Sequence, residues 1–336
     1  MKITVIPGDG IGPAITDATI RVLSALECDL EFAFCTAGET ALREEGALLP
    51  EKTLQSIGET KVALKGPITT PVGEGFTSVN VQLRQHFNLF ANVRPVRSYP
   101  GISTRYDSID LITLRQNTEG MYAGEGQFLS DDGSRAEAKS VITRAGSEEF
   151  LRYAFQLARS MGRTRLTLLH KANILKSTSG LFLSVGRSVK KEFPDLEYGE
   201  MIVDAAAMNL VKAPEQFDML VTTNLLGDII SDLCAGLVGG LGMAPGANIG
   251  ADTAIFEAVH GSAPDIAGKD LANPSALLLA AALLLDHIGM PHQAIRIRRA
   301  IEETTSQAST RTVDLGGTLG TQAYTDLLIS YIHNQK

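Results

Sequence analysis

Short apolar runs alternate along the chain with segments of helical periodicity. The runs predict strands at Ile3–Ile6, Val62–Leu64, Leu111–Leu114, Leu166–Leu169 and Met219–Thr222. Apolar positions three and four residues apart predict helices at Pro13–Leu26, Glu148–Met161, Leu181–Glu192, Gly227–Leu237, Pro274–Ile288 and Pro291–Thr304. Strands that alternate with helices in this way indicate an α/β protein whose sheet is flanked by helices.

Three stretches depart from this alternation. Residues 120–143 are polar, contain glycine and alternate weakly around a turn signal at residues 131–133, which predicts a β-hairpin-like excursion from the main sheet. Residues 276–285 are all apolar, but ten residues are typical of a buried core helix and too few to cross a membrane. Residues 233–251 carry no charge over nineteen residues, yet their many glycines favour turns and close-packed backbone. We expect no membrane segment.

Composition narrows the class of protein. The chain has 336 residues, enough for two domains, and its 44% hydrophobic content supplies a sizeable core. Thirty basic residues against 38 acidic ones give a net charge of −8, which argues against a nucleic-acid or anionic-membrane partner. Cys28, Cys35 and Cys234 form no CxxC pair, so we expect free thiols in a reducing cytoplasm.

Two glycine-containing loops are candidates for binding a dinucleotide. Gly8–Gly12 follows a strand and opens a helix, but Pro13 stands where the third glycine of GxGxxG is required, so a tight structural turn is favoured. The second loop runs from residue 257 to residue 268. Its Gly261–Ala263 segment would let backbone N–H groups approach a pyrophosphate, although small-residue loops also simply pack.

Charged residues supply two further candidates. Asp228 and Asp232 lie one helical turn apart among apolar neighbours, which suggests a Mg²⁺ or Mn²⁺ site, with an acidic pair beside a helix cap as the alternative. Arg84, Arg94, Arg97 and Arg115 are suited to binding carboxylates, or are surface arginines. Lys171 follows a predicted strand, as a base of lowered pKa or a solvated loop lysine.

Eight ordered segments resemble the β-decarboxylating dehydrogenases, the isocitrate and 3-isopropylmalate dehydrogenase family, over nearly the whole chain. They are GDGIGP (8–13), GPITTPVGEG (66–75), LFANVRPVR (89–97), RQNTEGMYAGEG (115–126), HKANILKSTSGLF (170–182), DAAAMNLV (204–211), the glycine-rich run 222–250 and EAVHGSAPDIAGKDLANP (257–274). The resemblance implies a two-domain fold that is not a Rossmann fold. Residues 1–95 and 240–336 would form a large α/β domain with the NAD site, and residues 96–239 a small one. Residues 120–143 would clasp a partner subunit in a homodimer.

The resemblance also implies roles for individual residues. Tyr122 would protonate the enol carbon, and Lys171 from the other subunit would handle the hydroxyl proton. Metal ligands would be Asp228 and Asp232, with Asp204 from the other subunit. Substrate contacts are implied at Ser78, Asn80, Arg84, Arg94, Arg115 and Asn173, and NAD contacts at Ile68, Thr69, Thr70, Glu257, His260, Gly261, Ser262, Ala263, Asp265, Ile266 and Asn273. We expect Asp228→Asn to raise the metal requirement while leaving the fold intact. Gln116 departs from the family, which usually has glutamate there.

Two short motifs predict the cofactor and the substrate. Asp265-Ile266 is similar to NAD-dependent members, because NADP-dependent relatives of the isocitrate type carry Lys-Tyr there. Ser78 and Asn80 match the S-x-N-x-x-L-R pattern of isocitrate dehydrogenases. Isopropylmalate enzymes place apolar residues upstream of the shared Leu-Arg, and homoisocitrate enzymes typically lose the asparagine. We expect isocitrate to be converted to 2-oxoglutarate, CO₂ and NADH, a step of the tricarboxylic acid cycle. The alternatives are homoisocitrate, 3-isopropylmalate, tartrate or malate as substrate, or a non-catalytic regulatory subunit.

Overall fold

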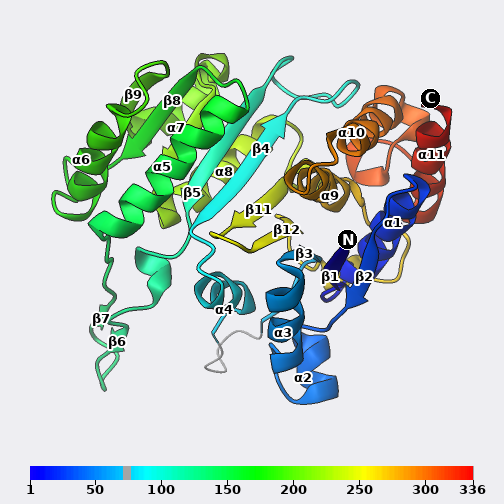
Figure 1. The fold of residues 1–336 in the computed structure, drawn as a ribbon, viewed down its shortest axis with the longest axis horizontal. Helices are drawn as coiled ribbons and strands as arrows, with labels where there is room; N and C mark the ends of the chain where they lie inside the picture. The colour runs from blue at the N-terminus through cyan, green and yellow to red at the C-terminus, as the bar shows by residue number, and fades with distance from the viewer. Residues whose placement is uncertain (71–76, 336) are drawn as a thin grey trace.

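Ten strands pair into one sheet within the described residues, and helices cover both faces of it (Figure 1). The computed structural model describes residues 1–70 and 77–335. The spatial order is β2-β1-β3-β12-β11-β4-β5-β10-β8-β9. β4 and β11 pair antiparallel with each other, β11 with β12 and β4 with β5, whereas the other neighbours run parallel. The predicted α/β fold is confirmed.

The predicted elements are present, with ends that differ by a few residues. The strands of the main sheet are β1 (Lys2–Ile6), β2 (Glu31–Phe34), β3 (Val62–Lys65), β4 (Ala91–Arg97), β5 (Asp110–Gln116), β8 (Arg165–His170), β9 (Glu197–Ile202), β10 (Met219–Thr222), β11 (Pro245–Ile249) and β12 (Ala254–Ala258). The helices are α1 (Gly12–Ala25), α2 (Glu39–Glu45), α3 (Glu51–Thr60), α4 (Val79–His86), α5 (Arg144–Ser160), α6 (Thr178–Lys190), α7 (Val203–Lys212), α8 (Asn224–Leu237), α9 (Ser275–His287), α10 (Pro291–Ser306) and α11 (Thr321–Asn334).

Helix α9 is the central helix of the hydrophobic core. Ten of its thirteen residues are buried, as expected for a helix that is apolar on every side. It packs on β11 and β12 and lies beside α10 and α1. In the part of the chain that the structure describes, no helix combines the length and the hydropathy that crossing a membrane requires.

The excursion at residues 120–143 forms the predicted hairpin. β6 (Phe128–Leu129) and β7 (Ala136–Glu137) pair antiparallel, and an isolated bridge joins Gly120 to Val141 at the base. The hairpin extends away from the sheet and is exposed along most of its length (Figure 1). Its role as an arm that clasps a second subunit stays a prediction.

The division into two domains also stays a prediction, because one sheet runs through both parts. β2, β1, β3, β12 and β11 belong to residues 1–95 and 240–336, whereas β5, β10, β8 and β9 belong to residues 96–239. β4 lies between the two groups and crosses the predicted boundary at residue 95.

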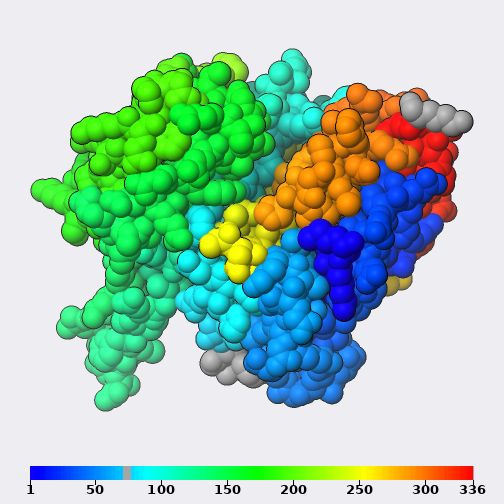
Figure 2. All heavy atoms as spheres, in the orientation of Figure 1, coloured from blue at the N-terminus to red at the C-terminus, as the bar shows by residue number. Residues whose placement is uncertain are grey.

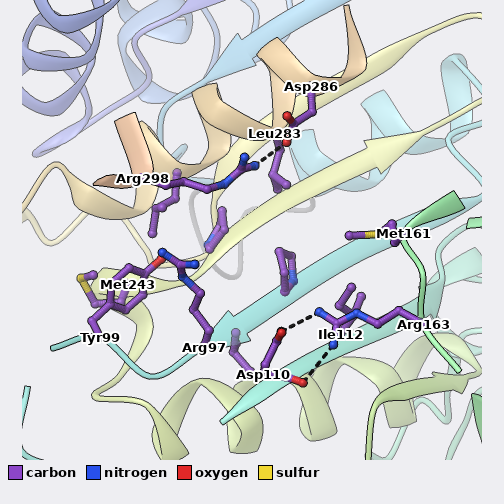
Figure 3. Close-up of a pocket in the computed structure, with 14 residues that line it drawn as sticks. Arg97, Tyr99, Asp110, Ile112, Met161, Arg163, Met243, Leu283, Asp286 and Arg298 are labelled. Carbon is purple, nitrogen blue, oxygen red and sulfur yellow. Dashed lines mark hydrogen bonds and ion pairs between the residues drawn. The ribbon is translucent and has the colours of Figure 1, made fainter. Parts of the chain in front are cut away.

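Alternation along β4 separates two features on opposite faces of the sheet. The side chains of Val93, Pro95 and Arg97 line a hollow between α5 and α9, with adjoining cavities of about 260 and 400 Å³ (Figures 2 and 3). Asn92 and Arg94 lie on the other face, where Arg94 contacts Ser231 of α8. Arg97 is therefore separated from the other candidate arginines: it pairs with Glu302 and does not join their cluster.

Candidate active site

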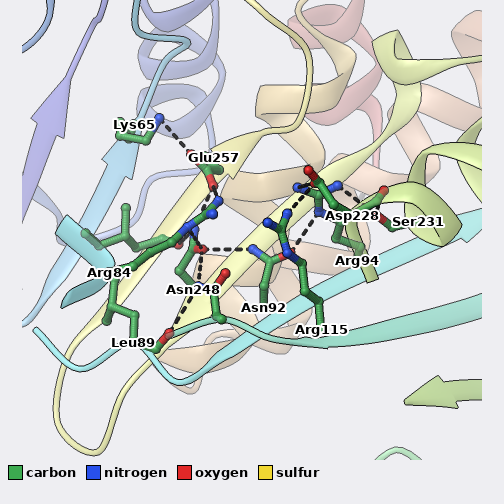
Figure 4. A network of polar contacts seen from close by, with 12 residues as sticks. Lys65, Arg84, Leu89, Asn92, Arg94, Arg115, Asp228, Ser231, Asn248 and Glu257 are labelled. Atoms are coloured by element: carbon green, nitrogen blue, oxygen red, sulfur yellow. Dashed lines mark hydrogen bonds and ion pairs between the residues drawn. The ribbon is translucent and has the colours of Figure 1, made fainter. Parts of the chain in front are cut away.

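Three arginines from three different elements form a cluster, in which Arg94 and Arg115 contact α8 and Arg84 contacts Asn248 and Glu257 (Figure 4). Arg84 comes from α4, Arg94 from β4 and Arg115 from β5. Their side chains are buried, with Arg115 only 1% exposed. Burial, followed by the nearby charge of Arg84, lowers the pKa of Arg115 to about 10, and burial also lowers the pKa of Arg94. The structure thus brings together the three arginines that were predicted to bind substrate.

Asp228 and Asp232 on α8 face this cluster. Asp228 pairs with Nη1 of Arg115 and lies 3.5 Å from Nη2 of Arg94, while Oδ1 of Asp232 accepts a 3.0 Å hydrogen bond from Nη1 of Arg94. Helix α8 begins at Asn224, so Asp228 lies beyond the first turn and the alternative of a pair beside a helix cap is wrong. The expectation that Asp228→Asn leaves the fold intact stays a prediction, but the substitution would remove the carboxylate that pairs with the buried Arg115, so we expect a loss of stability.

The two aspartates have different electrostatic environments. Burial acts to raise the pKa of Asp228, but Arg115, the Tyr122 hydroxyl and Arg94 together lower it overall. Burial raises the pKa of Asp232, and the negative charge of Asp228 raises it further. A divalent cation between the two carboxylates would relieve this repulsion, and carboxylate oxygens are ligands that Mg²⁺ and Mn²⁺ prefer. The pair therefore fits a divalent cation.

Tyr122 completes this part of the site. It lies on the short turn after β5, and its hydroxyl donates a 2.5 Å hydrogen bond to Oδ2 of Asp228. The Arg115 guanidinium stands 4.8 Å from the centre of the Tyr122 ring. Burial and the bond to Asp228 raise the pKa of the Tyr122 phenol, so it carries its proton at neutral pH.

A buried polar network that the sequence did not predict is joined to Arg84. Lys65 and Glu257 are opposite each other in the β3–β12 register, and Nζ of Lys65 is 2.7 Å from Oε2 of Glu257. Nη2 of Arg84 lies 3.6 Å from the other carboxylate oxygen. Burial opposes ionisation of Glu257, yet Lys65 and Arg84 lower its pKa to about 2. Glu257, predicted as an NAD contact, is therefore a buried partner of these two cations.

Ser78 and Asn80 lie at the start of α4, on the same helix as Arg84. Ser78 is the N-cap residue, and its side chain makes no capping hydrogen bond within the described residues. Asn80 lines a small space beside Lys65, Arg84 and Glu257, and its Oδ1 is buried without a partner among those residues. Among the described residues, Asn80 therefore has a polar atom available next to Arg84, and Ser78 lies two residues before Asn80 at the start of the same helix.

The two glycine-containing loops pack against each other. Gly10 has a φ of +59°, and a Cβ there would meet the carbonyl oxygen of Ser262 at 2.0 Å. The carboxylate of Asp9 accepts 2.9 Å bonds from the backbone N–H groups of Thr40 and Thr69. Gly8–Gly12 is the predicted structural turn, and it supports the second loop.

The predicted cofactor residues form a group around that second loop. The hydroxyls of Thr69 and Ser262 are 2.6 Å apart, which joins the segment 68–70 to the segment 260–266. A Cβ at Gly261 would meet nothing within 4 Å, so the backbone there faces open space. Asp265 is exposed at the end of the loop. Open backbone beside an exposed carboxylate fits a dinucleotide with a pyrophosphate and a free ribose.

Two further predicted cofactor residues have internal contacts. Asn273 is buried: its amide nitrogen donates a 2.9 Å bond to Asp314, and its oxygen accepts a bond from the backbone N–H of Ser275. Asp314 also lies near His260, although burial dominates and lowers the pKa of that histidine. Asn273 is therefore held by Asp314, whereas Nδ1 of His260 lies 3.0 Å from the backbone oxygen of Gly261.

Lys171, Asn173 and Asp204 lie apart from the arginine cluster. Lys171 pairs with Asp204, and that pair, together with the exposed Asn173, lies where β8 and β9 end. Within residues 1–70 and 77–335, no third His, Cys, Asp or Glu joins Asp228 and Asp232 as a possible metal ligand. Within one copy of the chain, therefore, the predicted site residues form two separate groups.

The chain is similar to known proteins over nearly its whole length. The family described as isocitrate/isopropylmalate dehydrogenase matches residues 2–328. A solved isocitrate dehydrogenase from Methylococcus capsulatus is 51% identical with a TM-score of 0.96, over 98% of this chain and 99% of that one. A 3-isopropylmalate dehydrogenase from Methanothermobacter thermautotrophicus is 46% identical over 96% of this chain and 95% of its own length. Catalytic subunit 5 of the mitochondrial NAD isocitrate dehydrogenase of Arabidopsis thaliana is 46% identical over 98% and 88%.

The fold and the family match place the chain among the oxidoreductases. The chain belongs to the isocitrate/isopropylmalate dehydrogenase family, whose members are decarboxylating dehydrogenases that in general use NAD and Mg²⁺ or Mn²⁺. Its relatives at similar identity include both isocitrate and 3-isopropylmalate dehydrogenases. Overall similarity therefore does not identify the substrate, which has to be inferred from the residues of the site.

Proposed function

We propose that the chain oxidises and decarboxylates isocitrate with NAD and a divalent cation. The observation that carries the proposal is the charge of the buried cluster. Its cations are Lys65, Arg84, Arg94 and Arg115, and its carboxylates are Asp228, Asp232 and Glu257. One positive charge is left over, and Nη2 of Arg115 is buried without a hydrogen-bond partner among the described residues. Buried cationic donors in excess favour an anionic ligand.

The charge count favours a tricarboxylate over a dicarboxylate. A divalent cation on Asp228 and Asp232 would raise the positive excess to three, which the three carboxylates of isocitrate match. Isopropylmalate, malate and tartrate have two carboxylates and would leave one buried positive charge unmatched. They would also leave the polar atoms of Ser78 and Asn80 without partners, at a cost of roughly 1–3 kcal/mol for each buried group.

Homoisocitrate has the same charge as isocitrate, so length separates the two acids. Ser78 and Asn80 stand on the first turn of α4, less than two turns from Arg84. Both match the isocitrate pattern, whereas homoisocitrate enzymes typically lose the asparagine. A side chain retained at position 80 leaves less room for the additional methylene of the longer acid, which supports isocitrate.

Each side chain of the site would have a different role in catalysis. Arg94 and Arg115 would hold substrate carboxylates, for which a guanidinium offers paired N–H donors. Tyr122, protonated at neutral pH, would give its proton to the carbon that loses CO₂. When bound, the cation would supply Lewis-acid stabilisation of the developing oxygen charge, and NAD would accept the hydride.

The exposed Asp265 supports NAD as the cofactor. Its carboxylate can accept hydrogen bonds from the two hydroxyls of an adenosine ribose, and it would repel a 2′-phosphate. Ile266 beside it is half-buried against the hydrophobic core, which fixes the position of the loop.

A second copy of the chain would complete the site. Lys171 and Asp204 lie apart from Asp228, and large apolar side chains next to all three are exposed: Ile174 by 68%, Met208 by 54% and Ile229 by 59%. Exposed apolar side chains beside both groups of site residues support a subunit interface there. We therefore infer a homodimer in which Lys171 of one copy takes the hydroxyl proton of substrate bound by the other, with the 120–143 arm around the partner.

The three free cysteines support a reducing compartment, the cytoplasm.

Product analysis tests this function. The purified protein with isocitrate, NAD and Mg²⁺ is expected to form NADH, CO₂ and 2-oxoglutarate in equal amounts. Release of NADH without CO₂, or no reaction although isocitrate binds, would overturn the proposal. The second outcome would favour a regulatory subunit.

A further inference from the structure

The buried carboxamide of Asn248 joins the substrate arginines to the Lys65–Glu257 pair. Asn248 lies on β11 directly opposite Asn92 on β4, and it is 3% exposed. Its Oδ1 accepts hydrogen bonds from Nε of Arg84 at 3.2 Å, from Nδ2 of Asn92 at 2.8 Å and from Nδ2 of Asn117 at 3.0 Å (Figure 4). Its Nδ2 donates to Oε1 of Glu257 at 2.7 Å.

The connection extends to the second arginine. Oδ1 of Asn92 accepts a 2.8 Å bond from Nε of Arg94, so a continuous path runs from Asn248 through Asn92 to that guanidinium. In both arginines the bond is made at Nε. A bond at Nε fixes the plane of the guanidinium and leaves its two terminal nitrogens to meet carboxylates.

The carboxamide of Asn248 is itself saturated. Its oxygen has three donors around two lone pairs, and the amide nitrogen donates to Glu257 and to the backbone oxygen of Ile255 at 3.3 Å. Asn248 therefore has no polar group free for a ligand. Any influence on the reaction must pass through the side chains that it holds.

We propose that Asn248 is a positioning residue for substrate binding, which sets the guanidinium of Arg84 directly and that of Arg94 through Asn92. The inference rests on the proposed function, in which both arginines bind substrate carboxylates. An alternative is that Asn248 only satisfies buried polar groups and so affects stability alone. The two roles differ in their kinetic consequences, because misdirected arginines weaken acid binding whether or not chemistry follows.

Asn117 offers a matched control. It is also a buried asparagine that donates to Oδ1 of Asn248, but its other bond goes to the backbone oxygen of Leu89 and it holds no arginine. Asn248→Ala and Asn117→Ala each remove buried hydrogen bonds from one network, and we expect both to lower the melting temperature. Only Asn248→Ala removes the bond to Nε of Arg84 and the bond that holds Asn92, the partner of Arg94.

Steady-state kinetics of the two variants test the inference. We expect Asn248→Ala to raise KM for isocitrate by about tenfold or more, with kcat and KM for NAD within about threefold of the unsubstituted protein. Asn117→Ala should leave all three constants within about threefold. Unchanged KM in Asn248→Ala, or an equal increase in Asn117→Ala, would overturn the positioning role.

A binding measurement separates this inference from the proposed function. Citrate, a tricarboxylate that lacks the secondary hydroxyl, is titrated calorimetrically into the protein and both variants. If the protein oxidises none of the hydroxy acids, the proposed function fails. In that case, the positioning role is supported if Asn248→Ala alone binds citrate more weakly than the unsubstituted protein. It is overturned if both variants bind citrate as tightly as the unsubstituted protein, or if the unsubstituted protein binds no citrate.

Discussion

The Tyr122 hydroxyl and the Asp228 carboxylate are joined by a 2.5 Å hydrogen bond across the space between the β5 turn and α8. Asp228 also pairs with Arg115, over which the Tyr122 ring lies. The proposed proton donor, a proposed metal ligand and a proposed substrate arginine therefore meet at one part-buried carboxylate.

Tyr122→Phe removes the proton donor but keeps the ring over Arg115. We expect kcat for isocitrate to fall by roughly 100-fold or more, a typical contribution of a general acid, while KM and the melting temperature change little. Stopped assays of CO₂ and NADH check this. A kcat within threefold of the parent would assign the proton to another group.

The aspartates of α8 are expected to differ in their effect on stability. Asp232→Asn should raise the Mg²⁺ concentration needed for half-maximal activity by tenfold or more with little loss of stability, because Arg94 keeps Asp228 and Ser231 as partners. Asp228→Asn should do the same and also destabilise the fold by about 3 kcal/mol, since Arg115 would stay buried without its carboxylate.

Metal titrations and urea unfolding measure these two effects separately. Excess EDTA should abolish activity of the parent protein, and Mg²⁺ or Mn²⁺ should restore it. Full activity in EDTA would contradict the metal site. Equal stability losses in the two variants would contradict the ion-pair assignment.

Glu257 should make folding sensitive to acid. Its pKa is about 2 in the folded protein and near 4.5 when unfolded, so the unfolded state binds the proton more readily. The stabilisation, on the order of 3 kcal/mol, is therefore fully present above pH 4.5, decreases as the pH falls through the interval between the two values, and is absent below about pH 2.

Urea unfolding of Glu257→Gln across this interval provides the check. The variant should be less stable than the parent at pH 7, because Lys65 stays buried without a counter-charge, and the difference should narrow towards pH 2. Adding Lys65→Met to Glu257→Gln should recover part of the stability. A difference that stays constant with pH would contradict the lowered pKa.

The cofactor prediction depends on Asp265 and Ile266. The double variant Asp265→Lys, Ile266→Tyr should lose NAD affinity and raise the kcat/KM ratio of NADP to NAD by at least about tenfold, because a cation replaces the carboxylate next to the 2′-position. The unsubstituted protein should favour NAD. Comparable kcat/KM for the two cofactors before substitution would contradict the prediction.

Periodicity predicted the strands that are mostly apolar, including β5 with Arg115, but it missed β4 and β11, which carry other polar residues of the site. β11 contains Asn248, and β4 contains Asn92 and Arg94, so neither reads as a continuous apolar run. These polar residues are buried on strands because they satisfy one another across the sheet, which depends on pairing register. Register between strands 150 residues apart has no local signal in the sequence.

The sequence motifs identified most of the site residues, but they did not show which charged groups surround each residue. Arg84, Arg94, Arg115 and Asp228 were expected from resemblance and do gather, but the resemblance gave no indication that Asp228 neutralises buried Arg115. Lys65 was missed because a lysine at the end of an apolar run reads as a solvated strand end. Only the β3–β12 pairing places it opposite Glu257.

The most direct test of the proposed substrate is a comparison of kcat/KM for isocitrate, homoisocitrate and 3-isopropylmalate, with NAD and Mg²⁺, on the unsubstituted protein. The charge excess of the arginine cluster and the polar atoms of Ser78 and Asn80 predict that isocitrate exceeds each of the others by at least about tenfold, the effect of one unpaired buried group. A higher kcat/KM for 3-isopropylmalate or homoisocitrate would contradict the assignment.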